Sequence, residues 1–384
     1  MVQQPNRSVT TMFPARRVLR HLALALVALI AVDAGPATVG AAHAEDRVIG
    51  ASGSAEGLYR QGVQLVYATN VVTEDTLRGV GLLERSADLG NVQAMLQLGS
   101  LSLYGQLFQR DWDKARSWFD KAAEAGDWSG LAQYGGMLMW SERNWREGQD
   151  LLEQAAERGI TSAWVTLAEG ATYGYLGGGR VSRAKYAGYA EKARAAGEPR
   201  IAVLEASRYQ WGISVDASGA KAVEILREAA DAGNAEAALA LVNLLRDGNG
   251  QNVRRNPAAA SAAMQDYAQL FSETEKWQLE RALQAARARG AEEYAALARE
   301  ILARGNLVTK DFGPMLMKAN LNAAIYVLQA KLSAAGADLG APDGLAGSRT
   351  LAAMYTACMK AAPPSACKDS VMRKDVIAAL YTQR

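Results

Sequence analysis

The residue types that most often perform chemistry are scarce in this chain of 384 residues, which holds two histidines and two cysteines. Both histidines, His21 and His43, lie in a segment that we expect to be removed from the mature protein. Histidine is the usual general base and the commonest zinc ligand, so its loss excludes Ser–His, Cys–His and histidine–metal sites. A pair of carboxylates could still cleave a glycosidic bond, but we expect most acidic residues to lie on exposed helix faces. The sequence therefore predicts no catalytic residues, no metal and no cofactor.

The two cysteines, Cys358 and Cys367, are separated by a short segment that contains Pro363 and Pro364. Two lone cysteines joined by a short turn are expected to pair in an oxidising compartment. Loop-closure entropy predicts that such a disulfide contributes about 2–3 kcal/mol, and we expect it to join the last two helices. A free, redox-active pair is the alternative.

The first 44 residues have the pattern of a cleavable signal peptide. Arg16, Arg17 and Arg20 precede an apolar run over 22–32, and an Ala-x-Ala site ends at Ala44. The run is shorter than the roughly 18–20 residues that a membrane span needs. We therefore expect export to the periplasm by the Sec or the twin-arginine route, with a signal anchor as the alternative. The mature chain is expected to have no membrane span.

Charge is nearly balanced along the chain, with 42 basic and 40 acidic residues. Four of the basic residues and one acidic residue lie in the predicted signal peptide, so the mature chain is close to neutral. Nucleic-acid binding depends on a clustered excess of Lys and Arg. We therefore expect no nucleic-acid partner.

Regularly spaced glycines indicate which elements fill the rest of the chain. Each glycine is the last residue of a similar five-residue segment that is rich in alanine and acidic residues. The five glycines are 36, 33, 38 and 36 residues apart: Gly90, Gly126, Gly159, Gly197 and Gly233. A second glycine lies fifteen residues after four of them: Gly105, Gly174, Gly212 and Gly248. A period in the mid-thirties with two turn residues predicts stacked antiparallel helix pairs. The predicted fold is all-α, with an α-solenoid over 45–305 and a further helix pair over 274–304.

Small residues recur inside the first helix of each pair, where they allow close helix packing. They lie four residues after the repeat glycine at Ala94, Gly130, Ala163 and Ala237, and nine residues after it at Gly99, Gly135, Ala168 and Ala206. Together with the Ala-Ala-x-x-Gly phrase and the loop glycine, they resemble the Sel1-like subfamily of tetratricopeptide-type repeats over residues 55–271. The resemblance implies a solenoid that binds a protein partner.

Tryptophans are the candidate partner-binding residues of this solenoid. Six of the eight lie between positions 112 and 164, and large rings are common anchors at interfaces. Trp112 and Trp128 are the two that we select, since Trp112 lies beside acidic residues at an expected helix start. Packing between repeats is the alternative for most of the six.

After Gly305 the regular spacing of glycines ends. Residues 327–354 resemble the three-helix peptidoglycan-binding domain of cell-wall proteins. The predicted module covers 306–384, and the resemblance implies peptidoglycan contact at Asp343, Gly344, Gly347 and Thr350. The chain departs from the family pattern at Ala337 and at Ala357-Cys358. The alternative is a helical cap that closes the end of the solenoid.

These features favour a non-catalytic periplasmic adaptor, whose solenoid binds a protein and whose last module contacts the cell wall. A second hypothesis is a scaffold or regulator of exopolysaccharide synthesis or export, including inhibition of a sensor kinase. A third is a cell-wall hydrolase or its accessory, although solenoid and module leave no room for a catalytic domain. The sequence does not specify the partner or the oligomeric state.

Overall fold

The structure is a computed structural model, and it describes residues 53–68, 72–105, 107–141, 144–361 and 364–383. The predicted signal peptide lies outside these residues. All the regular elements in the described ranges are helices. The predicted all-α solenoid is therefore confirmed.

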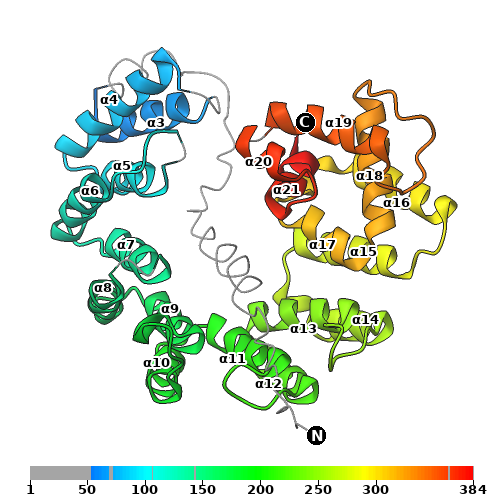
Figure 1. Cartoon of the computed structure of the whole chain (residues 1–384), viewed down its shortest axis with the longest axis horizontal. Helices are drawn as coiled ribbons and strands as arrows, with labels where there is room; N and C mark the ends of the chain where they lie inside the picture. The colour runs from blue at the N-terminus through cyan, green and yellow to red at the C-terminus, as the bar shows by residue number, and fades with distance from the viewer. Residues whose placement is uncertain (1–52, 69–71, 106, 142–143, 362–363, 384) are drawn as a thin grey trace, which may run out of the picture.

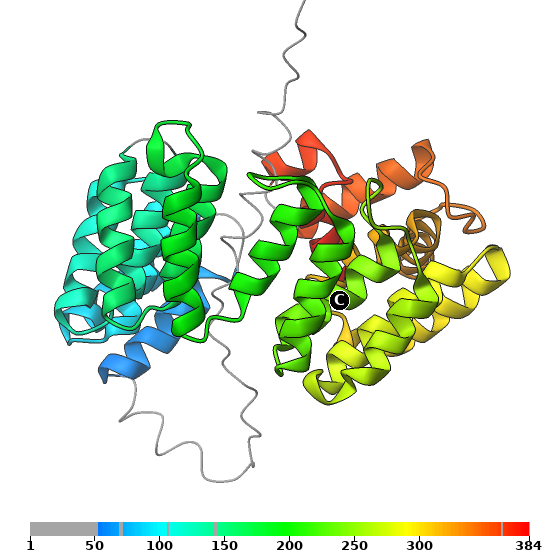
Figure 2. The ribbon, with the colours of Figure 1, turned by 90° about the horizontal axis from the view of Figure 1, so that it is seen from below.

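Within the described part of the chain, seven helix pairs precede Gly305. Their bounds, in chain order, are α3 (Ala55–Val66) and α4 (Glu74–Asp88), α5 (Val92–Tyr104) and α6 (Trp112–Glu124), α7 (Ser129–Trp140) and α8 (Trp145–Glu157), α9 (Ser162–Tyr173) and α10 (Arg183–Ala195), α11 (Arg200–Trp211) and α12 (Gly219–Asp231), α13 (Ala235–Asp247) and α14 (Pro257–Asp266), α15 (Glu273–Arg287) and α16 (Ala291–Ala303). The pairs follow one another along a curve, with α5, α7 and α9 on its inner side and α6, α8 and α10 on its outer side (Figure 1). Seen from below, the helices of the first repeats run alongside one another (Figure 2).

Each repeat glycine ends one helix and leads directly into the next. Gly90 has φ 86°, a backbone conformation that costs glycine little energy but is strained for residues with a Cβ. Its N–H donates to the carbonyl of Ala87, and the N–H of Asn91 donates to the carbonyl of Ser86, which is a Schellman motif. The side chain of Asn91 then caps α5 by accepting from the N–H of Ala94 at 2.9 Å. The four later repeat glycines also have positive φ, as the spacing predicts.

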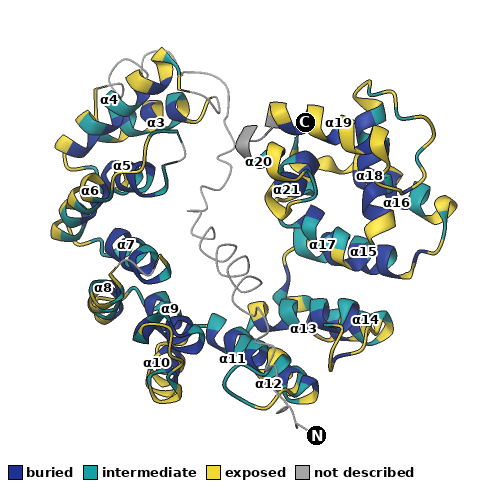
Figure 3. Ribbon diagram, viewed as in Figure 1, coloured by how far each residue is buried: buried dark blue, intermediate teal, exposed yellow. Residues whose placement is uncertain are grey.

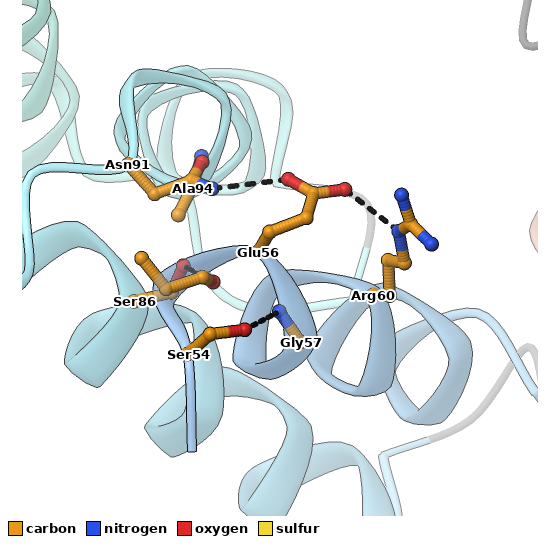
Figure 4. Close-up of polar contacts among 8 residues, drawn as sticks. Ser54, Glu56, Gly57, Arg60, Ser86, Asn91 and Ala94 are labelled. Carbon is orange, nitrogen blue, oxygen red and sulfur yellow. Dashed lines mark hydrogen bonds and ion pairs between the residues drawn. The ribbon is translucent and has the colours of Figure 1, made fainter. Parts of the chain in front are cut away.

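Polar contacts fasten the first pair to the second at the same place (Figure 4). Ser54 caps α3 by accepting from the N–H of Gly57, and the hydroxyl of Ser86 in α4 donates to the carbonyl of Ala55. The amide of Asn91 reaches Glu56 at 3.4 Å, while Glu56 also pairs with Arg60 at 2.7 Å. The start of α3 is therefore held by both α4 and α5.

Glycines let the two helices of a pair approach closely. A Cβ on Gly135 of α7 would lie 2.9 Å from the carbonyl oxygen of Gly148 in α8, and one on Gly148 would lie 2.5 Å from the carbonyl oxygen of Gly135. Gly62 and Gly79 face each other in the same way between α3 and α4. The predicted role of small residues in helix packing is confirmed for Gly135, whereas Gly62, Gly79 and Gly148 were not among the predicted residues.

The helices after Gly305 are α17 (Phe312–Ala319), α18 (Leu321–Ala334), α19 (Ser348–Ala361), α20 (Pro364–Asp369) and α21 (Lys374–Thr382). They share one hydrophobic cluster with α15 and α16. Phe312 packs between Trp277 of α15 and Tyr381 of α21, with ring centroids 5.5 and 6.2 Å away. The amide of Asn320 donates to two carbonyls at the end of α15. The core is thus continuous across the predicted boundary at 305/306, and the domain limits stay predictions.

Cys358 and Cys367 form the predicted disulfide, with their Cα atoms 5.8 Å apart. Both are buried. The bond joins α19 to α20, not the last two helices, because the residues after Pro364 form a short helix of their own before α21 begins.

Candidate binding surfaces

The residues predicted to contact peptidoglycan gather around one buried glutamine. Gln329 of α18 is 3% exposed. Its Nε2 lies 2.7 Å from Oδ1 of Asp343, 3.0 Å from Oγ1 of Thr350 and 3.1 Å from the carbonyl oxygen of Leu345. Its Oε1 accepts from the N–H groups of Asp343 and Gly344, at 3.0 and 2.8 Å. We call these five residues the Gln329 network.

This network fixes the loop between α18 and α19. Hydrogen bonds from Gln329 and from the N–H of Leu345 favour the charged form of Asp343 and lower the pKa of its carboxyl. Gly344 has φ 77°, and a Cβ there would lie 2.7 Å from the carbonyl oxygen of Asn322. Gly347 is exposed, with open space around it. Three of the four predicted residues, Asp343, Gly344 and Thr350, therefore help to hold the loop in place. The sequence did not predict that Gln329 would be the residue to which all three bond.

Apolar side chains are exposed next to this loop. Leu345 is 57% exposed, and Leu351, Tyr355 and Met359 follow one face of α19 at a spacing of four residues. Soluble proteins expose single apolar residues freely, but a contiguous group marks a contact surface. We call these four residues the α19 patch.

Trp112 and Trp128, the predicted partner-binding residues, are half-buried in contacts between repeats. The ring of Trp112 meets that of Tyr134 edge-on, with centroids 5.8 Å apart. The guanidinium of Arg158 lies 3.9 Å from the ring centroid of Trp128. Trp118 and Trp164 are buried, so packing accounts for them. Partner binding at Trp112 and Trp128 stays a prediction.

The two sides of the curved stack differ in charge. The inner helices α5, α7 and α9 together contain a single charged residue, Glu169, whereas each of α6, α8 and α10 contains several. Figure 3 shows exposed residues concentrated on the outer helices, while the inner helices are mostly buried or intermediate. Uncharged hydrogen-bonding side chains are half-buried on the inner helices: Gln97, Ser100, Gln133 and Thr166. We call this surface of α5, α7 and α9 the inner face.

The sequence profile of the Sel1 repeat matches residues 58–91, 92–127 and 204–234. These segments overlap α3–α4, α5–α6 and α11–α12, and each ends one residue after its repeat glycine. The three units are Sel1 repeats. A solenoid of Sel1 repeats is typically a non-catalytic scaffold for protein interactions.

Two solved structures are similar to this chain. One is a Sel1 repeat protein from Oxalobacter formigenes, with 20% identity, a TM-score of 0.38, and coverage of 57% of this chain and 89% of that one. The other is a protective antigen of uropathogenic Escherichia coli with an SLR fold, with 20% identity, a TM-score of 0.37, and coverage of 88% and 78%. No curated protein sequence matches this chain.

A pocket between α14, α15 and α16, the last helices of the stack, has Glu280, Glu293 and Glu300 in its lining. Glu280 and Glu300 pair with Arg281, and Glu293 accepts from the N–H of Arg289. Each of these carboxylates thus has a basic residue or a backbone N–H beside it. Among the described residues no group of three His, Cys, Asp or Glu could hold a metal ion. No helix in the described ranges has the length and apolarity of a membrane span.

Glu169 of α9 is buried beside Arg200, whose guanidinium lies 3.3 Å from the carboxylate. Burial raises its pKa from 4.5 to about 6, and Arg200 opposes this shift. A pKa that is raised in the folded state stabilises the fold at low pH, and the benefit is lost as pH rises through 6. A shift of this size corresponds to about 2 kcal/mol. The ionised group therefore costs stability above pH 6.

We expect Glu169→Gln to remove this cost, because glutamine can still accept from Arg200 without bearing a charge. Wild type and variant should have similar free energies of unfolding at pH 4, and the variant should be more stable by about 2 kcal/mol at pH 8. Urea unfolding followed by circular dichroism at both pH values measures the difference. An equal difference at both pH values would contradict the prediction.

Proposed function

We propose that this protein is a non-catalytic adaptor of the periplasm, whose Sel1-repeat solenoid binds a protein partner and whose last module contacts the cell wall. The observation that carries the proposal is the uninterrupted stack of helix pairs from α3 to α16, continued by α17–α21 in one core. Such a stack offers an extended surface and few enclosed sites, which suits binding more than catalysis. The predicted signal peptide supports the location.

The α19 patch supports contact with the wall. It lies beside the loop that the resemblance to peptidoglycan-binding domains selects, and the Gln329 network holds that loop in one conformation. A preformed loop loses little entropy on binding. Leu345 and Tyr355 are then free to pack against a large ligand, since both side chains are exposed.

Co-sedimentation with purified peptidoglycan sacculi tests this proposal. Deleting residues 306–384 would expose Trp277 and its neighbours in the shared core, so point variants are the sharper test. We expect the full chain to pellet and the double variant Leu351→Ser/Tyr355→Ala to lose at least about tenfold in affinity. Leu302→Ser is the matched control, because Leu302 is an exposed leucine on α16. Pelleting that is equal for all three proteins, or absent for the full chain, rejects wall contact through the α19 patch.

A second candidate function is a scaffold or regulator of exopolysaccharide synthesis or export. The uncharged inner face favours it, because neutral polar side chains suit a carbohydrate better than a charged partner. A deletion strain with normal wall composition and reduced polysaccharide output would support this function over the first.

A further inference from the structure

Aromatic residues end successive inner helices at the same repeat position. Each lies fourteen residues after a glycine, and the helix bounds place it at the last residue of its helix or just after it: Tyr67, Tyr104, Trp140, Tyr173 and Trp211. The corresponding residue of the next repeat is Asp247, so the series stops there. We call these five residues the aromatic column. The helices that carry the column, α3, α5, α7, α9 and α11, follow one another along the curve (Figure 1). Because equivalent residues of stacked repeats lie side by side, we expect the column to follow one edge of the stack.

Two rings of the column are exposed, and two are held by a neighbouring residue. Tyr67 is 49% exposed and Trp211 is 45% exposed, while the other three are half-buried. The hydroxyl of Tyr67 accepts from the amide of Gln97 in the next repeat. The ring of Trp140 meets Tyr175 edge-on, with centroids 4.7 Å apart. Rings fixed by their neighbours form a prepared surface for stacking.

The polar groups beside the column are amides and hydroxyls. Gln97, Ser100 and Gln133 lie on the same helices and partly hydrogen-bond one another, with Ser100 donating to Gln133 at 3.4 Å. The charged residues nearest the column lie in the loops and on its last helix. Arg110 and Arg180 are exposed in the loops after Tyr104 and Tyr173. Arg208 of α11, in contrast, is buried with its guanidinium 3.5 Å from the ring centroid of Tyr186. No described residue of α5 or α7 carries a charge. A charged polymer would therefore meet no complementary ion on α5 and α7 themselves, and the alginate hexamer used below tests whether Arg110 and Arg180 attract an anion instead.

We propose that the aromatic column and the inner face bind an extended, uncharged glycan. A hexose presents an apolar C–H face, which stacks on an aromatic ring, and a rim of hydroxyls, which pair with amides and hydroxyls. Packed helices lie about 8–10 Å apart, a spacing comparable to one disaccharide unit, so a repeating polymer matches a repeating surface. Several weak stacking contacts between one glycan chain and successive rings then give a higher combined affinity than any single contact. The proposal does not depend on wall contact by the α19 patch.

Titration calorimetry of the full chain with two neutral oligosaccharides, cellohexaose and chitohexaose, tests the proposal. We expect at least one of them to bind, and Trp140→Ala and Trp211→Ala each to weaken binding about tenfold. Trp211 is largely exposed, so its variant should fold even if Trp140→Ala does not. Trp145→Ala, on the outer helix α8, is the matched control and should bind like wild type. The α19 patch variants should also bind normally, which separates this site from the one tested with sacculi.

Three outcomes would overturn the proposal. One is that neither oligosaccharide binds. Another is that the column variants bind as tightly as Trp145→Ala does. The last is that an alginate hexamer or a proline-rich peptide binds in their place, which would assign the inner face to an anionic polymer or to a polypeptide.

Discussion

Replacing Gly148 with alanine is expected to destabilise the protein by about 3 kcal/mol. The new Cβ would lie 2.5 Å from the carbonyl oxygen of Gly135 and 3.0 Å from the backbone nitrogen of Met139. Both atoms belong to the backbone of α7, so no side-chain rotation relieves the contact. The helices α7 and α8 must separate, and the buried side chains between them, Leu138 and Leu151 among others, lose contacts.

Gly188→Ala is the matched control for this variant. Gly188 is an exposed interior residue of α10, a Cβ there would meet nothing within 4 Å, and its φ is helical. Alanine loses less backbone entropy than glycine on folding, so we expect a gain of about 0.5–1 kcal/mol. Urea unfolding of both variants measures the contrast. If both variants changed stability by the same amount, close approach at Gly148 would not be what limits stability.

The sequence predicted the solenoid well because its signals are local and repeated. A glycine that ends a helix with positive φ, as Gly90 does, needs only its own backbone conformation to be recognised. The small residues nine positions later were also informative, since Gly135 lies at the α7–α8 crossing. Its partner Gly148 has no repeat signature of its own, so only the structure shows that the two glycines face each other.

The candidate sites were less predictable, because exposure depends on neighbours one repeat away. Trp112 follows an acidic residue at a helix start, yet it packs against Tyr134 of the next helix pair. Trp211 has no local feature that distinguishes it, yet it is among the most exposed large apolar residues. The aromatic column does have a sequence signal, an aromatic residue directly before the loop glycine or its equivalent. Aligning the repeats by both glycines, and not by the first alone, reveals it.

Gln329→Leu is the other variant for which we expect a large effect, a loss of about 3 kcal/mol or more. Leucine fills a similar volume but offers no hydrogen bonds, so the N–H groups of Asp343 and Gly344 lose their partner, and the hydroxyl of Thr350 keeps only its bond to the carbonyl of Leu345. Each buried polar group left unpaired costs about 1–3 kcal/mol. Urea unfolding measures the total, and hydrogen exchange at the amides of Asp343 and Gly344 should accelerate because the loop detaches from α18.

Asp343→Asn separates the hydrogen bonds of this loop from its charge. Asparagine keeps an oxygen that accepts from Gln329 and from the N–H of Leu345, and the side chain is exposed, so we expect a much smaller loss of stability than for Gln329→Leu. If Gln329→Leu were no more harmful than Asp343→Asn, Gln329 would not be what holds the loop. Because Asp343, Gly344 and Thr350 already bond to Gln329, the proposed wall contact is expected to involve the neighbouring α19 patch. Gln329→Leu should then weaken sacculus binding by displacing Leu345, although Gln329 itself is too buried to touch the ligand.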